Sequence, residues 1–166
     1  MLLDLIKPLL FKLDTCVYVE FSSTLLFAKN TKTGACFKEK PLIAISRFDN
    51  SIKAFGNCAL EHQHDKAIRI VNPFDHPRSP LANTLYGEKL LHFVLSHLVQ
   101  SSMFRPAPKI ILRPLERTLG GLTDHEIRAL KEMCFGAGAR DALIYEHADA
   151  PAEPINFEYL KLTLAQ

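Results

Sequence analysis

A strand, a helix and a second strand at crossover spacing limit the folds open to this chain more than any other feature. Residues 109–112 form a short apolar run rich in β-branched side chains, typical of a buried strand. Thr123 and Glu126 stand at capping-box spacing and predict a helix that ends near Gly136. Residues 142–145 form a second short buried strand. Because parallel neighbours need a long crossover connection, this unit predicts an α/β fold with two parallel strands in one sheet.

Further elements are expected before this unit. Residues 16–21 and 24–29 predict two strands around Ser22 and Ser23, and a hairpin over 41–55 closes at Asp49–Asn50. Residues 57–66 indicate a short helix, and residues 68–71 another strand. A strong helix is predicted over 84–101, with an apolar stripe that comprises Leu90, Leu91, Val94, Leu95 and Leu98.

Composition limits the classes of protein to which this chain can belong. The 166 residues suit one domain with a real core, and a hydrophobic content of 48% excludes a disordered chain. The net charge of +2 comes without a dense lysine or arginine run, so no nucleic-acid partner is expected. The four cysteines form no CxxC pair and the N-terminus lacks the marks of a secretion signal, so we expect reduced cysteines and a cytoplasmic protein.

Motifs for catalysis or metal binding are missing from the sequence. His62, His64 and Asp65 do not have the spacing of a helical histidine pair, so no metal site is expected. The chain shows no glycine-rich loop of the P-loop or dinucleotide type, and no residue set resembles a nucleophile with its base. These observations favour a protein that is not an enzyme.

The motifs of the central unit resemble the bacterial actin homologue MreB, in the half that precedes the second phosphate loop of that family. The shared features are the RPxP run over 105–108, the helix that carries Glu126, the GAGAR run over 136–140, and Glu146 at a strand end. The likeness extends back to Asp14 and stops after Glu146. It covers most of this chain and about half of the family's fold. It implies an actin-like domain of the ATPase superfamily, with a mixed sheet flanked by helices.

The resemblance also implies a division of the chain. An amphipathic segment over 1–13 precedes an MreB-like domain over 14–147, which contains a small inserted subdomain at about 31–72. The tail over 148–166 diverges, because its prolines exclude the hinge helix that leads into the family's second half. Its apolar residues predict a terminal strand that covers surface otherwise buried by that second half; they are Ile155, Phe157, Tyr159, Leu162 and Leu164.

The first phosphate loop of the family corresponds to the turn near Ser22, Ser23 and Thr24. Tyr18 stands where the family has the aspartate that helps hold the magnesium shell, and Glu20 stands at the glycine. A glutamate there adds a side chain and a negative charge beside an anionic ligand, which opposes triphosphate binding. The resemblance implies ATP with magnesium as the family ligand, but these substitutions predict a vestigial loop and no cofactor.

Glu126 has two interpretations. It aligns with the glutamate that positions the attacking water in the family, which makes it a vestigial catalytic candidate. It also occupies the third position of the Thr123 capping box, where its role is structural. We expect the capping role.

Two apolar features suggest contact with a membrane. Residues 1–13 form either a helix docked on the protein's own core or an interfacial helix with lysines near anionic lipid. In MreB-like proteins a hydrophobic loop at the position of Met103 and Phe104 dips into the membrane. The candidate membrane residues are Leu2, Leu3, Leu5, Ile6, Leu9, Leu10, Phe11, Met103 and Phe104.

The sequence therefore predicts a non-catalytic MreB-like scaffold linked to bacterial cell shape. It would act in the cytoplasm or on the inner membrane surface, with a full-length actin homologue, a shape-complex protein or itself as partner. The alternative is a half-ATPase that binds ATP only when a partner supplies the second half. A third interpretation is a truncated remnant with no retained role.

Overall fold

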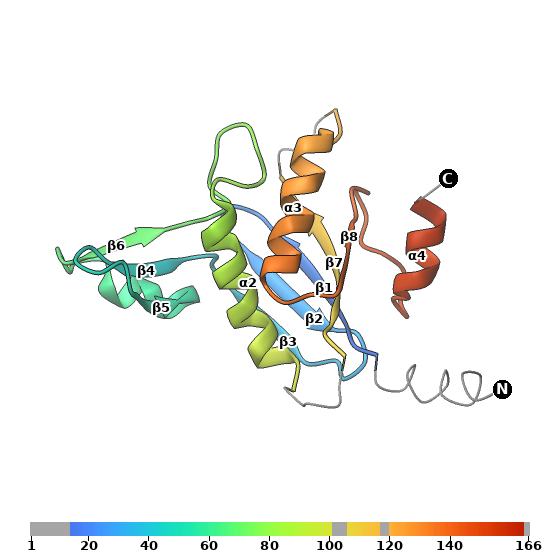
Figure 1. Cartoon of the computed structure of the whole chain (residues 1–166), viewed down its shortest axis with the longest axis horizontal. Coiled ribbons are helices and arrows are strands. Elements are labelled where there is room, and N and C mark those ends of the chain that lie inside the picture. Colours follow the sequence, from blue (N-terminus) through green and yellow to red (C-terminus); the bar gives the residue numbers. More distant parts are fainter. Residues whose placement is uncertain (1–13, 101–105, 117–119, 165–166) are drawn as a thin grey trace.

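The computed structural model describes residues 14–100, 106–116 and 120–164. Within these ranges, two β-sheets and their helices succeed one another in the order β1, β2, β3, β4, β5, η1, β6, α2, β7, α3, β8 and α4 (Figure 1). The small sheet extends to one side of α2, and the large sheet lies behind α2 and α3.

The large sheet has five strands in the order β3-β2-β1-β7-β8. β1 (Cys16–Phe21) pairs antiparallel with β2 (Leu26–Asn30), which pairs antiparallel with β3 (Cys36–Glu39). On its other side β1 runs parallel to β7 (Lys109–Pro114), and β7 runs parallel to β8 (Asp141–Ile144). The sheet is mixed, and the predicted parallel pair is confirmed.

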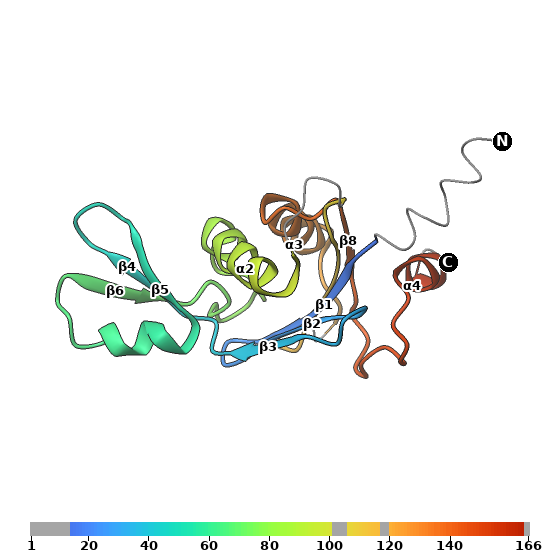
Figure 2. The same cartoon turned by 90° about the horizontal axis from the view of Figure 1, so that it is seen from below.

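Helices α2 (Thr84–Leu98) and α3 (Asp124–Gly136) cover one face of this sheet (Figure 2). The predicted stripe of α2 is buried, and it packs in one core with Val17, Val19, Ile110 and Leu112 of the central strands. The helix begins at an asparagine cap, because Asn83 Oδ1 accepts from the Tyr86 amide at 2.9 Å. The predicted helix at Thr123 is also confirmed, and Gly138 just beyond α3 takes a φ of 104°.

The tail forms a helix, α4 (Phe157–Leu164), so the predicted terminal strand is wrong. Phe157 and Leu160 lie three residues apart and both pack on Tyr18, Ile111 and Tyr145. Tyr159 and Leu162 point outward instead and are 66% and 69% exposed. The buried Phe157 and the partly buried Leu160 therefore lie on one face of a helix, which the alternation of a strand would not give.

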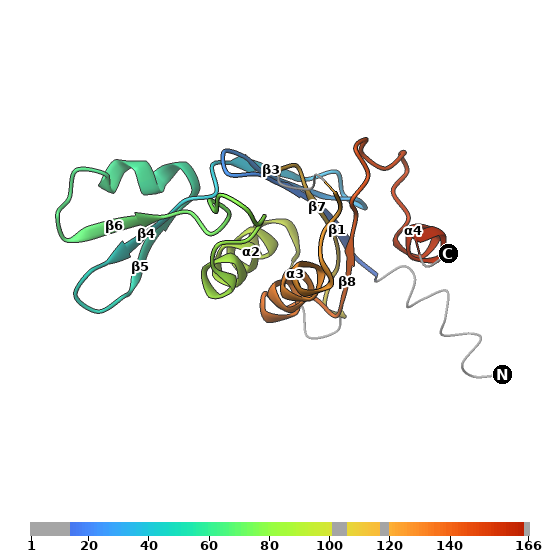
Figure 3. The same ribbon diagram turned by 90° about the horizontal axis from the view of Figure 1, so that it is seen from above.

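Helix α4 covers the face of the large sheet opposite α2 and α3 (Figure 3). It is held by charge as well as by packing. The Lys109 ammonium lies 2.5 Å from a Glu158 oxygen and Lys161 lies 2.6 Å from Asp141. The Lys109 ammonium also lies 5.3 Å from the centre of the Phe157 ring. The tail thus covers the second face of the sheet as a helix. That the family's second half would otherwise bury this surface stays a prediction.

The small sheet is antiparallel, in the order β5-β4-β6. The predicted hairpin is confirmed as β4 (Ile43–Ser46) and β5 (Ile52–Phe55), and the predicted strand β6 (Ile68–Val71) completes the sheet. A 3-10 helix, η1 (Gly56–His62), stands where a short helix was expected. β3 belongs by its hydrogen bonds to the large sheet. The subdomain boundary at about 31–72 stays a prediction.

Candidate functional site

In the turn between β1 and β2, where the phosphate loop was expected, side chains of this chain accept hydrogen bonds from the backbone amides. Ser22 Oγ accepts from the amides of Thr24 at 3.2 Å and Leu25 at 3.0 Å. The Ser23 amide donates to Glu116 Oε2 at 3.0 Å. A carboxylate of the protein therefore lies against a backbone amide of this turn, the kind of donor that binds anions in phosphate loops.

The turn is also tied to the segment after β6. Asn72 Nδ2 donates to the Ser23 carbonyl at 2.6 Å, and Asn72 Oδ1 accepts from the Phe74 amide at 3.0 Å. Phe74 is buried against Phe21, with ring centroids 4.5 Å apart. These contacts attach the β1–β2 turn to the segment that follows β6, and they pack that segment against Phe21 at the end of β1.

Tyr18 and Glu20 lie together on the face of β1 that α4 covers. The Tyr18 hydroxyl donates to Glu20 Oε1 at 2.6 Å, and Arg113 Nη1 lies 2.5 Å from the same oxygen. The Glu20 side chain is 19% exposed and the Arg113 side chain 11%. Burial, together with the Glu20 carboxylate, raises the pKa of Tyr18 well above its usual value, so the hydroxyl remains a donor.

Arg113 connects this cluster to the segment after β8. Its Nε donates to the His147 carbonyl at 3.1 Å, and its Nη2 donates to the Ala148 carbonyl. Sequence reasoning identified neither Arg113 nor Glu116. Each lies 93 residues from its partner in the turn or in β1, and no local pattern links such distant charges.

Glu126 forms the predicted capping box. Its Oε2 accepts from the Thr123 amide at 2.9 Å, and the Glu126 amide donates to Thr123 Oγ1 at 3.3 Å. The hydrogen bond from the Thr123 backbone holds the pKa of Glu126 below its usual value. The predicted capping box is therefore present.

Arg140, the last residue of the GAGAR run, meets Asp14 and Lys109 in an ion cluster at the start of the central strands. Lys109 Nζ lies 2.8 Å from Asp14 Oδ2, and Arg140 bonds to the other Asp14 oxygen. Burial by itself raises the pKa of Asp14, but the hydrogen bonds from Lys109 and Arg140 hold it below its usual value.

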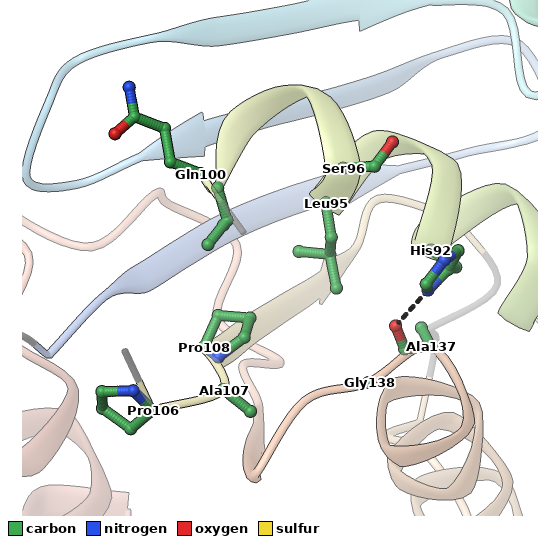
Figure 4. Close-up of a pocket in the computed structure, with 10 residues that line it drawn as sticks. His92, Leu95, Ser96, Gln100, Pro106, Ala107, Pro108, Ala137 and Gly138 are labelled. Carbon is green, nitrogen blue, oxygen red and sulfur yellow. Dashed lines mark hydrogen bonds between the residues drawn. The ribbon is translucent and has the colours of Figure 1, made fainter. Parts of the chain in front are cut away.

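A pocket of about 330 Å³ lies at this end of the fold, between α2 and the segment that enters β7 (Figure 4). Leu95, Pro106 and Pro108 line it with apolar surface. His92 Nδ1 lies 3.0 Å from the Ala137 carbonyl, which joins α2 to the end of α3. In the part of the chain that is described, no group of three or more acidic, histidine or cysteine side chains is placed to hold a metal ion.

The membrane candidates, Leu2, Leu3, Leu5, Ile6, Leu9, Leu10, Phe11, Met103 and Phe104, lie outside the described residues. Across residues 14–100, 106–116 and 120–164, no helix has both the length and the apolar character that crossing a membrane requires.

Comparison with known sequences finds similarity to MreB proteins. The chain is 28% identical over 149 residues to the cell shape-determining protein MreB of Pasteurella multocida, covering 86% of this chain and 40% of that protein. It is 28% identical over 150 residues to MreB of Haemophilus influenzae, with the same coverage. The chain therefore spans about 40% of the length of these relatives. No family model matches.

Solved structures give the same fold. MreB5 of Spiroplasma citri bound to AMPPNP superposes with a TM-score of 0.66 at 21% identity, over 80% of this chain and 38% of that one. A MamK double helical filament superposes with a TM-score of 0.58 at 12% identity, over 79% of this chain and 41% of that one. In sequence the chain thus resembles an N-terminal fragment of MreB, and its fold is actin-like.

Proposed function

We propose that this chain is a non-catalytic, MreB-like cytoskeletal protein linked to bacterial cell shape. It works in the cytoplasm at the inner membrane surface, through association with a complete actin homologue or another protein of the shape complex. The observation that carries this proposal is the β1–β2 turn, where the Ser23 amide donates to the Glu116 carboxylate.

This contact weighs against nucleotide binding for an electrostatic reason. A phosphate at the turn would have to displace Glu116 from the Ser23 amide and would then lie beside the displaced carboxylate. Two unit negative charges about 4 Å apart repel by about 4 kcal/mol at an effective dielectric constant of about 20. Glu20 adds a further carboxylate on β1, although Arg113 pairs with it.

Calorimetry with Mg-ATP on the purified chain tests the proposal. We expect no saturable heat at physiological ATP concentration. The matched variant is Glu116→Gln, which keeps an acceptor for the Ser23 amide and removes the charge. Saturable micromolar binding by the parent chain would overturn the proposal.

One observation favours a second function, the half-ATPase. The chain has the β1–β2 hairpin, where the phosphate loop is expected, within a fold that superposes on AMPPNP-bound MreB5. If a complete actin homologue supplies the other half of a site, Mg-ATP should bind the mixture more tightly than it binds the homologue alone. Equal affinity with and without this chain would exclude the half-ATPase.

The membrane part of the proposal rests on sequence alone. Residues 1–13 combine large apolar side chains with Lys7 and Lys12, and each lysine near an anionic leaflet contributes about 1 kcal/mol. We expect the chain to sediment with anionic liposomes at low salt, and a variant without residues 1–13 to remain largely in the supernatant. Sedimentation that is equal for both chains would contradict the membrane role of this segment.

A further inference from the structure

β8 is an edge strand with hydrogen-bonding groups directed outward. Within the described chain it pairs with β7 alone. The Tyr145 amide donates to the Leu112 carbonyl of β7 at 2.9 Å, so Leu143 and Tyr145 direct their backbone groups toward β7. Because these directions alternate along a strand, the backbone groups of Ala142 and Ile144 point away from β7, toward the open edge of the sheet.

The edge of β8 lacks the charges that usually discourage pairing with another chain. Its sequence is Asp-Ala-Leu-Ile, and the carboxylate of Asp141 is paired with Lys161 at 2.6 Å. β3, at the opposite edge of the sheet, carries the exposed Lys38 instead. Lysine on an edge strand is a common protection against edge-to-edge association, so the two edges of this sheet differ.

A groove of about 480 Å³ runs beside β8. Leu143 and Ile144 of the strand line it, together with Ile127 and Lys131 of α3 and Leu164 of α4. Figures 2 and 3 show α3 and α4 on opposite sides of β8. An added strand at this edge would therefore find backbone partners and apolar side chains on both faces.

We propose that the edge of β8 pairs with β8 of a second copy of this chain, antiparallel about a two-fold axis at Leu143. In this register Ala142 faces Ile144 of the second copy, so the outward backbone groups of both strands meet. The same register places Arg140 opposite Glu146 of the second copy, twice by symmetry, which matches a cation to an anion at each end. An axis at Ala142 would instead place Arg140 opposite Ile144.

The two-fold register closes the assembly at two chains, because each copy uses its single β8 edge. The interface goes beyond the proposed function, since it involves neither the β1–β2 turn nor nucleotide. Its failure would leave the proposal about the turn untouched.

Sedimentation of the intact chain over a range of micromolar concentrations tests the dimer. We expect a monomer–dimer equilibrium, and Glu146→Lys should weaken it about tenfold by placing like charges opposite each other across the strands. The matched control is Glu61→Lys, which makes the same charge change at an exposed position in η1 and should leave the equilibrium unchanged. A parent chain that stays monomeric throughout, or equal effects of the two variants, would overturn the proposal.

A cross-link at the axis tests the register. Directly opposed residues in a non-hydrogen-bonded antiparallel pair have Cα atoms about 4.5 Å apart, which a disulfide can span. Leu143→Cys, with the exposed Cys36 and Cys58 changed to serine, should oxidise to a covalent dimer. Lys38→Cys in the same background, on the opposite edge, should stay largely uncross-linked. Equal cross-linking at both edges would refute the register, even if Glu146→Lys failed to fold.

Discussion

Arg113→Met should destabilise the fold through the charge that it leaves behind. Arg113 lies 2.5 Å from Glu20, and both side chains are mostly buried. The substitution keeps an apolar stem of similar length but removes the cation. It also removes the two donors that hold the His147 and Ala148 carbonyls.

The size of the loss follows from the burial of the pair. Removing one partner of a buried ion pair costs about 3–5 kcal/mol, because the other charge stays buried without compensation. Glu20 is 19% exposed and keeps the bond from the Tyr18 hydroxyl, so the lower end applies. We expect a loss of about 3 kcal/mol in the free energy of unfolding.

Urea unfolding followed by circular dichroism measures this loss. The double variant Glu20→Gln with Arg113→Met should recover part of it, since no buried charge is left unpaired. The control is Arg128→Met, because Arg128 is 79% exposed and its pair with Glu132 is expected to contribute less than about 0.5 kcal/mol.

Two outcomes would refute this reasoning. If Arg113→Met unfolds at the same urea concentration as Arg128→Met, the buried pair contributes no more than a surface one. If the double variant is as unstable as the single variant, the loss comes from packing or from the missing bonds to the His147 and Ala148 carbonyls, and not from the orphaned Glu20 charge.

Three further predictions concern stability. Asn30→Ala should cost about 2 kcal/mol in urea unfolding, because the buried Asn30 amide donates to the Leu98 carbonyl at the end of α2 at 2.9 Å. Glu126→Ala should cost about 1 kcal/mol by removing the capping box, and Glu126→Gln should cost less. Although burial opposes it, hydrogen bonds from two basic side chains hold the pKa of Asp14 below its usual value. Its contribution is therefore fully present above the unfolded pKa of about 4 and is lost as the pH falls through the lower folded pKa, so Asp14→Asn should flatten the acid side of a stability–pH profile.

A specific result would contradict each of these predictions. An Asn30→Ala chain as stable as a Gln63→Ala chain, changed at an exposed position, would show that the bond to α2 contributes little. Equal urea midpoints for parent and Glu126→Ala would contradict the capping role. A steep acid side that persists in Asp14→Asn would assign the pH dependence to other carboxyl groups.

The sequence by itself determined the elements whose signals are local. The apolar runs of β1, β7 and β8, the stripe of α2 and the capping box at Thr123 each lie within one short window. Crossover spacing then predicted the parallel pair of β7 and β8, because only a long connection can return a strand in the same direction. The MreB-like motifs over 105–146 also belong to this local class, and the comparisons confirm the resemblance they indicated.

Local signals failed where the tail meets the sheet. The apolar residues of 155–164 fit a strand by alternation, but past Phe157 the residue that packs on Tyr18, Ile111 and Tyr145 is Leu160, while Tyr159 is exposed. β3 escaped prediction for a related reason, since its four residues become a strand through pairing with β2. The conformation of α4 depends on the sheet surface beneath it, and that of β3 depends on the adjacent strand β2. In both segments burial and hydrogen bonding outweigh a weak intrinsic propensity.

The candidate site shows the same division. The sequence identified Tyr18, Glu20 and Ser23 by their positions relative to a family motif, but only the folded chain shows what they contact. Packing β7 beside β1 brings Arg113 to Glu20, and the turn after β7 brings Glu116 to the Ser23 amide, each across 93 residues. Which charges neutralise one another depends on distances of a few ångströms between strands, and those distances exist only after the sheet has formed.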